Sequence, residues 1–341
     1  MRLSIIIVNY RGWKRLRLCL ESLRCLNDAN FSWEVMVIDN HSDDAQLPTF
    51  IRDFPEFTFR ESGVNFGFAY GCNLGARETS GSYLLFLNPD TEVTLEVLEE
   101  MLTTAEYNRG ISILSCSQVT ANGKDTRPYG FSLGLRTLTS FLRSIYKLTH
   151  KPFPTKTLES GLTVLFPDWV SGSVVMMSRE QYEALDGWCE DFWMYYEDAD
   201  LCKRAWEAGG QVALIQNLKV THNHGGASRI NLDVKALTKS EVVISRHVYV
   251  RNHSKGLKRL LMQSYLVLNN LFFSQLLVAI VGIIFYVKPS FRVYPRLYIN
   301  IVKYYIRSLA NKTWISHRSI NYKNQRAHHF EDAAVEAPQL K

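Results

Sequence analysis

The stretch LSIIIVNYRGWKRLRLCLESLRCL (residues 3–26) shows two periodicities in succession, and together they decide the fold class. Its first seven residues are almost continuously apolar and β-branched, which is typical of a strand buried on both faces of a parallel sheet. Leu16, Leu20, Leu23 and Leu26 then recur at helical spacing, which predicts a helix with one apolar face. A buried strand that leads directly into an amphipathic helix is the repeating unit of α/β proteins.

The same alternation continues over the first two thirds of the chain. WEVMVIDN (33–40) and GSYLLFLNPD (81–90) predict further buried strands, and LEVLEEMLTTAEY (95–107) predicts a helix. Later strands are expected at ISILSC (111–116), SVVMMS (173–178) and QVALIQ (211–216). This order predicts an α/β fold with a mostly parallel sheet, in which ligands bind beyond the carboxyl ends of the strands. Asp39 and Asp90 stand at two of these ends.

Charge is divided unevenly along the chain, although the net charge is only +6. Residues 1–241 hold 24 Lys and Arg against 30 Asp and Glu, a balance of −6, whereas residues 242–330 hold 14 Lys and Arg and no acidic residue. Such a basic segment favours a polyanionic partner. The apolar residues between the charges favour an anionic membrane surface and argue against nucleic acid.

The segment LLMQSYLVLNNLFFSQLLVAIVGIIFYV (260–287) is long enough to cross a bilayer, which takes about 20 apolar residues. Gln263, Asn270 and Ser274 recur on it at helical spacing, and basic residues flank it on both sides. These features favour an amphipathic helix that lies in the membrane interface or re-enters it. A true membrane span and a buried core helix are the alternatives.

The scattered cysteines indicate a protein of the reducing, cytosolic compartment. The six cysteines form no C-x-x-C pair, which predicts reduced thiols: Cys19, Cys25, Cys72, Cys116, Cys189 and Cys202. The first residues have no signal-peptide layout, because their apolar run is too short. The polar tail from residue 321 is expected to be disordered.

Polar side chains follow the first two predicted strands, where a parallel sheet binds its ligand. The candidates for contacts with a nucleotide are Asn9, Tyr10, Asp39, Asn40 and Ser42. A carboxylate such as Asp39 can accept a hydrogen bond from a base or a ribose. The alternative is that Asp, Asn and Ser only form turns and helix caps here.

GVNFGFAYGCNLGA (63–76) has four glycines but lacks the G-x-G-x-x-G spacing of dinucleotide-binding proteins, which disfavours a Rossmann dehydrogenase. Glycines such as Gly67 can let the backbone approach a nucleotide, with Asn65 and Asn73 as hydrogen-bond donors. Close helix packing by the small residues is the alternative.

FLNPDTEV (86–93) places Asp90 after a buried strand and a proline-fixed turn. A carboxylate there can hold Mg²⁺ or Mn²⁺ that bridges a diphosphate, and Asn88 can add an amide oxygen. THNHGGAS (221–228) offers two histidines, of which one can complete a metal shell, and His222 is interpreted as structural. No Cys/His set at zinc spacing accompanies them.

WMYYEDADLCKRAWEAG (193–209) places the carboxylates Glu197, Asp198 and Asp200 within four residues. Acids at the start of a helix can simply interact with its dipole. Alternatively, one of them is a catalytic base whose pKa is tuned by the nearby aromatic residues and a second carboxylate. Asp200, two residues after Asp198, faces away from it on a helix.

In their order along the chain, seven motifs resemble those of the inverting family-2 glycosyltransferases with the GT-A fold, in particular the rhamnosyltransferase-like branch. They are SIIIVNYRGW, VIDNHSDD, NFGFAYGCNLGA, FLNPDTEV, WVSGSVVMMSRE, LDGWCEDFWMYYEDADLCKRAWEAGG and HNHGGAS. The resemblance runs from Leu3 to about Ser228. Any one motif alone is weak evidence for this family, but the seven motifs in this order are specific to it.

The resemblance implies a role for particular residues. Asp198 matches the general base, the second residue of the family's ED motif, and Asp39 matches the contact to the nucleotide base. Asp90 matches the last aspartate of the D-x-D metal motif, whose first position is Asn88 here, so one carboxylate is missing. His224 matches a histidine that completes the metal shell. The loop WVSGS and its surroundings match the acceptor and sugar pocket, formed here by Trp169, Ser171, Gly172, Tyr196 and Glu197.

The implied reaction moves a sugar with inversion from a nucleotide diphosphate to a hydroxyl, with Mg²⁺ or Mn²⁺ as cofactor. The donor expected is a dTDP- or UDP-sugar, with dTDP-L-rhamnose as the best candidate. The basic, apolar C-terminal part indicates a lipid-linked acceptor of the polyprenyl-diphosphate-GlcNAc type, used in surface polysaccharide assembly. A polyprenyl-phosphate sugar synthase and a non-catalytic membrane-bound scaffold are the alternatives.

The expected organisation follows from the motifs. Residues 1–230 form a GT-A catalytic domain, with a nucleotide-binding half (1–90) and an acceptor and catalytic half (91–230). Residues 231–320 form a helical, membrane-associating region, and residues 321–341 form the disordered tail. The expected location is the cytoplasmic face of the inner membrane, as a peripheral or monotopic protein.

Overall fold

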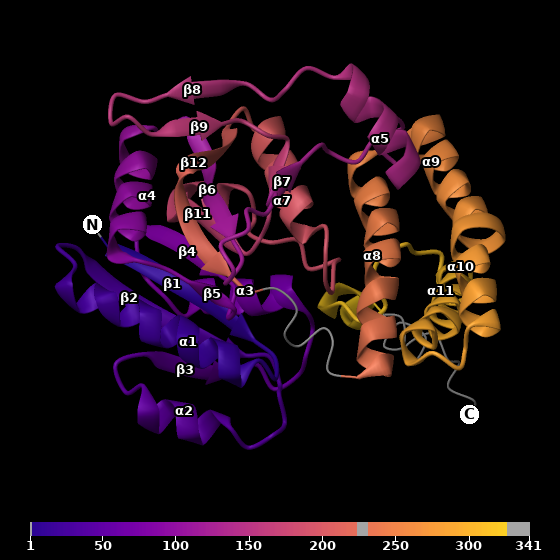
Figure 1. Ribbon diagram of the computed structural model, residues 1–341, viewed down its shortest axis with the longest axis horizontal. Helices are drawn as coiled ribbons and strands as arrows, with labels where there is room; N and C mark the ends of the chain where they lie inside the picture. Colours follow the sequence, from indigo (N-terminus) through magenta and orange to yellow (C-terminus); the bar gives the residue numbers. More distant parts are fainter. Residues whose placement is uncertain (1, 224–230, 326–341) are drawn as a thin grey trace, which may run out of the picture. The chain divides into compact units, whose positions relative to one another are not determined.

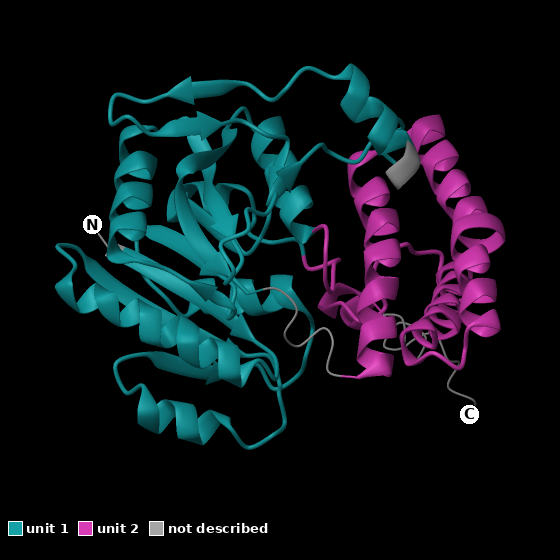
Figure 2. Cartoon of the chain, in the orientation of Figure 1, with its two compact units in different colours: residues 1–189, 197–230 teal, residues 190–196, 231–341 magenta. Residues whose placement is uncertain are grey.

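The computed structural model describes residues 2–223 and 231–325, and the chain divides into two compact units (Figure 2). Unit 1 comprises residues 1–189 and 197–230, and unit 2 comprises residues 190–196 and 231–341. Unit 1 is a mixed α/β structure and unit 2 is helical.

Unit 1 contains all the strands of the described chain. They are β1 (Arg2–Asn9), β2 (Ser32–Asp39), β3 (Thr58–Glu61), β4 (Tyr83–Leu87), β5 (Thr91–Glu92), β6 (Ile111–Val119), β7 (Tyr129–Gly130), β8 (Thr155–Thr157), β9 (Thr163–Leu165), β10 (Trp169–Val170), β11 (Val174–Ser178) and β12 (Gln211–His222). Its helices are α1 (Trp13–Leu23), α2 (Leu47–Asp53), α3 (Phe68–Arg77), α4 (Leu95–Tyr107), α5 (Ser140–Thr149), α6 (Arg179–Ala184) and α7 (Glu197–Glu207).

The main sheet has the order β3-β2-β1-β4-β11-β6-β12-β9-β8, with β5 paired to β12 (Figure 1). Strands β3, β2, β1 and β4 are mutually parallel, and β12 is parallel to β6. β11 runs antiparallel between β4 and β6. The prediction of a mostly parallel α/β sheet is therefore confirmed. The sequence did not predict β3 or the short strands β5 and β7–β10, because these segments are too short or too polar to show a period.

The two faces of β1 explain its continuous apolar sequence. Leu3, Ile5 and Ile7 join a buried cluster with residues of α1 and α4, whereas Ile6 and Val8 join a second cluster with residues of α3 and α7. Each of these side chains contributes on the order of 1.5–3 kcal/mol when fully buried. The predicted apolar face is confirmed, because Leu16, Leu20 and Leu23 of α1 and Leu26 of the 3₁₀ turn that follows it are fully buried.

The glycines of α3 let this helix pack closely on β1. A Cβ atom at Gly75 would lie 2.5 Å from Cγ2 of Ile6, and one at Gly71 would lie 2.7 Å from Cγ1 of Val8. Distances this short are not tolerated without movement of the strand. Two of the four glycines in this motif therefore serve helix packing, which was the alternative to backbone contact with a nucleotide.

Unit 2 is built on helices α8 (Leu232–His253), α9 (Gly256–Leu268), α10 (Ser274–Ile284) and α11 (Val293–Ala310), with a π-helical turn between α9 and α10. α11 packs against both α8 and α10. Within the described ranges, the one helical stretch apolar and long enough to cross a membrane is Gly256–Ile284. Only 17% of its most apolar window is buried.

In this stretch two amide side chains are buried, and many large apolar side chains are exposed. Gln263 and Asn270, predicted to mark a polar stripe, are 5% and 1% exposed. Gln263 bonds with His247 of α8, and Asn270 Nδ2 donates to the Tyr305 hydroxyl of α11 over 2.9 Å. Large apolar side chains face outward instead: Leu257, Leu260, Leu261, Tyr265, Leu268, Phe272, Phe273, Leu277, Ile280, Ile283 and Ile284. A buried core helix is therefore the wrong interpretation of this segment.

The ordered chain extends further than the sequence predicted. Residues 320–325 are helical, Tyr322 is buried, and Asn321 Nδ2 donates to Asp191 Oδ1 over 2.9 Å. The expectation of disorder from residue 321 is therefore wrong for these first residues, because one amide and one aromatic ring anchor them to unit 2.

Candidate active site

The ends of β1 and β2 bring four predicted residues together. Asn9 and Asp39 are paired in the parallel register, and Asn9 Nδ2 lies 3.5 Å from Asp39 Oδ1. Ser42 donates to Asp39 from its hydroxyl and, over 3.1 Å, from its backbone N–H. Asn40 follows directly and its N–H donates to the Asn9 carbonyl over 2.7 Å. Asp39 is only 3% exposed, and burial raises the pKa of its carboxyl, although the bonds from Ser42 oppose this.

The loop before α3 joins the same cluster. Asn40 Nδ2 donates to Asn65 Oδ1 over 3.2 Å and to the Gly67 carbonyl over 3.0 Å. Gly67 has a φ of +102°, a conformation that favours glycine, and its N–H donates to Asn65 Oδ1. Tyr10 lies beside them, with the Arg11 guanidinium 5.3 Å from its ring centre. Seven of the nine predicted nucleotide-binding residues thus lie around the ends of these two strands; the other two are Asn73 and Asn88.

Asn73 lies on α3, and its side chain bonds to another part of unit 1. Its Oδ1 accepts from the Tyr182 hydroxyl and from the Trp188 N–H, and its Nδ2 donates to the Trp188 carbonyl over 2.9 Å. These bonds hold the turn after α6 against α3. The structure does not support the prediction that Asn73 binds a nucleotide, because the oxygen and the nitrogen of its amide both form hydrogen bonds within the protein.

Asp90 and His222 meet at the next strand ends. β12 continues well past the predicted strand, and His222 pairs with Thr91 of β5. His222 Nε2 lies 3.1 Å from Asp90 Oδ1, and its Nδ1 lies 2.8 Å from Gln118 Oε1. His222 is 4% exposed. The residue interpreted as purely structural is therefore the histidine that contacts the candidate metal ligand.

A hydrogen-bond chain continues from this pair. Gln118 Nε2 donates to Ser173 Oγ over 2.7 Å, and Ser173 Oγ donates to Ser171 Oγ over 3.0 Å. The Asn88 N–H donates to the Ser173 carbonyl over 2.9 Å. Sequence reasoning missed Gln118, and it included Ser173 only as the last residue of the WVSGS loop. A buried amide at the end of the apolar strand β6 was the available signal for Gln118.

The donors at this point suit a divalent cation that also binds phosphate. The described residues contain no group of three or more His, Cys, Asp or Glu side chains that could hold a metal. Asp90 Oδ1 and His222 Nε2 are one hard oxygen and one imidazole nitrogen, close enough to occupy neighbouring positions on one ion. Mg²⁺ and Mn²⁺ sites of this kind take their remaining ligands from substrate phosphates and water. His224 lies outside the described residues.

Asp198 stands in the first turn of α7, beside the loop that follows β10. Its Oδ2 accepts the Gly172 N–H over 3.1 Å, and its Oδ1 accepts the Ala199 N–H over 2.8 Å. An added Cβ at Gly172 would lie 3.4 Å from the Asp198 Cβ, so the loop backbone approaches the carboxylate closely. Burial raises the pKa of Asp198, and the two backbone N–H groups oppose that shift.

The flanking acids have different roles. Glu197 is 7% exposed, and its Oε2 has no hydrogen-bond partner within the described chain. Burial and the neighbouring Asp198 charge hold the pKa of Glu197 well above its usual range. Asp200 is 1% exposed and accepts Arg204 Nε over 2.8 Å. Glu197 therefore keeps its proton more readily than Asp198, which leaves Asp198 as the carboxylate able to accept one.

The substitution Glu197→Gln is expected to stabilise the protein more at about pH 8 than at about pH 5. The raised pKa means that the folded state binds more protons than the unfolded state between the unfolded and the folded pKa. The free energy of unfolding of the wild type therefore falls as pH rises through that window, and Gln removes this dependence. Thermal unfolding of both proteins over this range measures the effect. A difference in midpoint that does not change with pH contradicts the raised pKa.

The remaining pocket residues fall in two places. Trp169 packs on Gly130 of β7, and its Nε1 donates to the Phe131 carbonyl over 3.0 Å, which fixes the ring. Ser171 belongs to the hydrogen-bond chain above. Tyr196 belongs to unit 2, where its hydroxyl accepts Arg246 Nε over 3.1 Å and its φ is +67°.

Comparison with known proteins points to one class of enzyme. Residues 4–162 match the family model described as Glycosyl transferase family 2, and residues 158–224 match one described as N-terminal domain of galactosyltransferase. The chain is 28% identical over 225 residues to the low-salt glycan biosynthesis hexosyltransferase Agl10 of Haloferax volcanii, covering 65% of this chain and 67% of that protein. It is 24% identical over 230 residues to the rhamnosyltransferase WbbL of Escherichia coli, covering 64% and 82%.

A solved structure shares the fold. The mannosyltransferase PcManGT from Pyrobaculum calidifontis, in complex with GDP-Man and Mn²⁺, superposes with a TM-score of 0.51 at 16% identity. The match covers 92% of this chain and 88% of that one. At this identity the similarity concerns the fold alone.

Proposed function

Because the chain carries a glycosyl transferase family 2 domain and is a glycosyltransferase, we propose that it transfers a hexose with inversion from a nucleotide diphosphate to a hydroxyl. The donor we propose is dTDP-L-rhamnose. The acceptor is the saccharide of a lipid-linked intermediate, of the polyprenyl-diphosphate-GlcNAc type, in surface polysaccharide assembly. The name of the relative WbbL supports rhamnose as the sugar.

The position of Asp198 carries this proposal. Two backbone N–H groups fix the carboxylate, and its neighbour Glu197 retains a proton more readily. Asp198 accepts the proton of the acceptor hydroxyl as that oxygen forms its bond to the anomeric carbon, and the bond from that carbon to the diphosphate oxygen breaks. Attack opposite the leaving group inverts the configuration. A carboxylate with a raised pKa is better matched to this proton transfer than an ordinary aspartate.

The two strand-end clusters would hold the two parts of the donor. Asp39, with Asn9, Asn40 and Ser42, offers acceptors and donors to the base and ribose. Asp90 and His222 would hold Mg²⁺ or Mn²⁺, which would neutralise the charge that develops on the departing diphosphate. The missing carboxylate at Asn88 leaves Asp90 as the one acidic ligand that the D-x-D position supplies.

We also propose that residues 231–320 associate with the cytoplasmic face of the inner membrane. The stretch Gly256–Ile284 exposes most of its large apolar side chains, whereas its amides Gln263 and Asn270 are buried. Lys255, Lys258 and Arg259 lie at the start of this stretch, and Lys288 and Arg292 follow its end, so anionic headgroups would be attracted at both ends. Such a region would bring a lipid-linked acceptor to the enzyme.

Nucleoside-diphosphate release from a panel of sugar nucleotides tests the function. We expect release from dTDP-L-rhamnose that requires a polyprenyl-diphosphate-GlcNAc acceptor and Mg²⁺ or Mn²⁺, and that is lost in EDTA. A product with a sugar–phosphate bond would instead identify a polyprenyl-phosphate sugar synthase. Release that survives EDTA would contradict the metal assignment. If no donor releases nucleoside diphosphate, with or without the acceptor, the transferase reaction is contradicted.

A further inference from the structure

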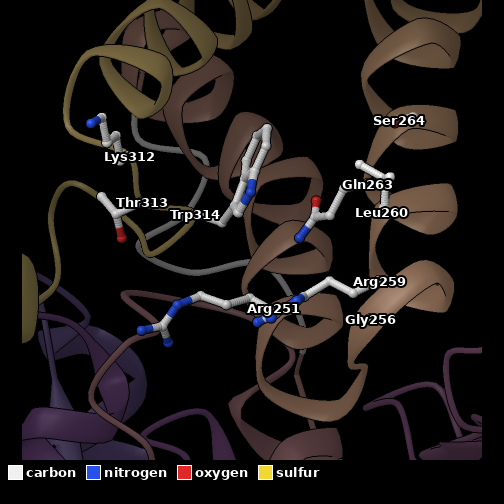
Figure 3. Close-up of a pocket in the computed structure, with 9 residues that line it drawn as sticks. All are labelled: Arg251, Gly256, Arg259, Leu260, Gln263, Ser264, Lys312, Thr313 and Trp314. Carbon is white, nitrogen blue, oxygen red and sulfur yellow. The ribbon is translucent and has the colours of Figure 1, made fainter.

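Unit 2 contains a pocket whose lining includes none of the site residues described above. It has a volume of about 340 Å³, and its lining includes Arg251, Arg259, Leu260, Lys312 and Trp314. Figure 3 shows that these side chains come from the end of α8, the first turns of α9 and the segment after α11. The junction of α8 and α9 and a segment about 50 residues later therefore form one concave site.

The pocket carries an excess of positive charge. Arg251 is paired with Asp191 over 2.8 Å, but Arg259 and Lys312 have no ion-pair partner in the part of the chain that the structure describes. None of the described lining residues is acidic. His247, on which the Trp314 ring stacks at 5.0 Å, adds no charge, because burial lowers its pKa to about 4. Two unneutralised cations in a concavity favour an anion.

The backbone at the start of α9 adds to this preference. Lys255 occupies the N-cap position of α9 and its side chain makes no capping hydrogen bond. The first N–H groups of a helix then lack intrahelical acceptors and attract negative charge, phosphate in particular. Gly256, the first residue of the helix, has open space around it and lines the same pocket.

One side of the pocket opens onto an apolar surface. Leu260 is 62% exposed, and further apolar side chains point outward along α9: Leu257, Leu261, Tyr265 and Leu268. Trp314, half-buried at the opposite wall, is a residue type enriched at membrane–water interfaces. A ligand that matches both surfaces has an anionic group at one end and a hydrocarbon chain at the other.

We propose that this pocket binds the phosphate group of a membrane lipid, with the phosphate between Arg259 and Lys312 and the hydrocarbon chain along the exposed face of α9. Two sources supply this chemistry: an anionic phospholipid, and the diphosphate of a lipid-linked acceptor. The second source rests on the proposed function, and the first does not.

A pair of double variants of the full-length protein tests the proposal. Arg259→Gln with Lys312→Gln removes the two unpaired cations of the pocket. Lys303→Gln with Arg307→Gln is the matched control, because both residues are exposed cations on α11, outside the pocket lining, and the change in net charge is equal. Thermal unfolding of both variants verifies that they remain folded.

Binding to phosphatidylglycerol vesicles, with phosphatidylcholine vesicles as reference, tests the first source. We expect the pocket variant to bind at least about fivefold more weakly than the control variant. Inorganic pyrophosphate should compete for wild-type binding but not for that of the pocket variant. This measurement needs no turnover, so it decides the phospholipid source even if the proposed reaction is wrong.

Acceptor kinetics test the second source. If the acceptor diphosphate occupies the pocket, the pocket variant has a KM for the lipid-diphosphate acceptor about tenfold above that of wild type. Its KM for the same saccharide on an uncharged alkyl chain, its KM for the donor and its kcat stay unchanged. Equal behaviour of the two double variants in both the vesicle and the kinetic measurements overturns the proposal, because general surface charge then accounts for all the effects.

Discussion

Asp198→Asn is expected to lower kcat for sugar transfer by about 10³-fold while leaving donor affinity unchanged. An amide cannot accept the proton of the acceptor hydroxyl. The Asn side chain has the same shape, and its oxygen can still accept the Gly172 N–H that positions Asp198, so the loop and the first turn of α7 should keep their places. The loss should therefore appear in the chemical step alone.

Single-turnover transfer and donor titration measure the two quantities separately. Glu197→Gln is the control, since it changes the adjacent acid, which keeps its proton more readily, and we expect it to keep kcat within about tenfold of wild type. The assignment of the base to Asp198 is wrong if Asp198→Asn remains within tenfold of wild type. It is also wrong if Glu197→Gln shows the larger loss.

The dependence of transfer on pH gives a second test of the same residue. Burial raises the pKa of Asp198, so the acidic limb of the rate profile should lie above the value of about 3.9 typical of an unperturbed aspartate. Activity falls as pH decreases through this raised value, because the protonated carboxyl can no longer accept a proton. An acidic limb at the unperturbed value contradicts the raised pKa.

The sheet and its first helices could be predicted because each local pattern agrees with the tertiary structure. The run from Ile5 to Ile7 is apolar at every position because both faces of β1 are covered. The cluster around Asp39 was predictable for the same reason, since parallel strands in register end together and bring Asn9 opposite Asp39. The pattern of apolar residues located the strands, and the ends of the strands located the cluster.

The contacts of His222 and Asn73 could not be predicted, because they depend on long-range geometry. His222 reaches Asp90 only because β12 continues across an irregularity between Ile215 and Lys219 and then pairs with β5. Nothing local distinguishes Asn73 from a ligand-binding asparagine, and its partner Trp188 lies 115 residues later. Whether such a side chain bonds to the protein or to a ligand is decided by the tertiary packing, not by the residue type.

In unit 2 the sequence predicted a polar helix face but assigned it to the wrong side. The spacing of Gln263 and Asn270 predicted one polar face, and polar faces of surface helices normally point to water. Here both amides bond inward to α8 and α11, so the apolar face points outward. The composition of a helix defines its two faces but not which of them meets the protein, and the hydrogen-bond partners on neighbouring helices decide that.

Asp90→Asn is expected to weaken metal-dependent donor binding and to lower kcat/KM by about 10²- to 10³-fold. The substitution removes the Asp90 carboxylate, and the neighbouring Asn88 offers an amide and no second acid. It keeps the shape of the side chain, and the amide can still bond to His222 Nε2, so the ends of β4 and β12 should remain in place. The metal would then have no charged protein ligand at this point.

Donor titration with Mn²⁺, with Mg²⁺ and with EDTA distinguishes a metal ligand from a structural acid. If Asp90 holds the metal, wild type binds the donor more tightly with a cation than with EDTA, and Asp90→Asn binds it equally weakly in all three. Asp125→Asn is the control, because Asp125 is an exposed acid paired only with Lys219 among the described residues, and it should behave as wild type. If Asp90→Asn only lowers the thermal unfolding midpoint and keeps its cation-dependent donor binding, then Asp90 serves to position His222, and the cation is held by other groups.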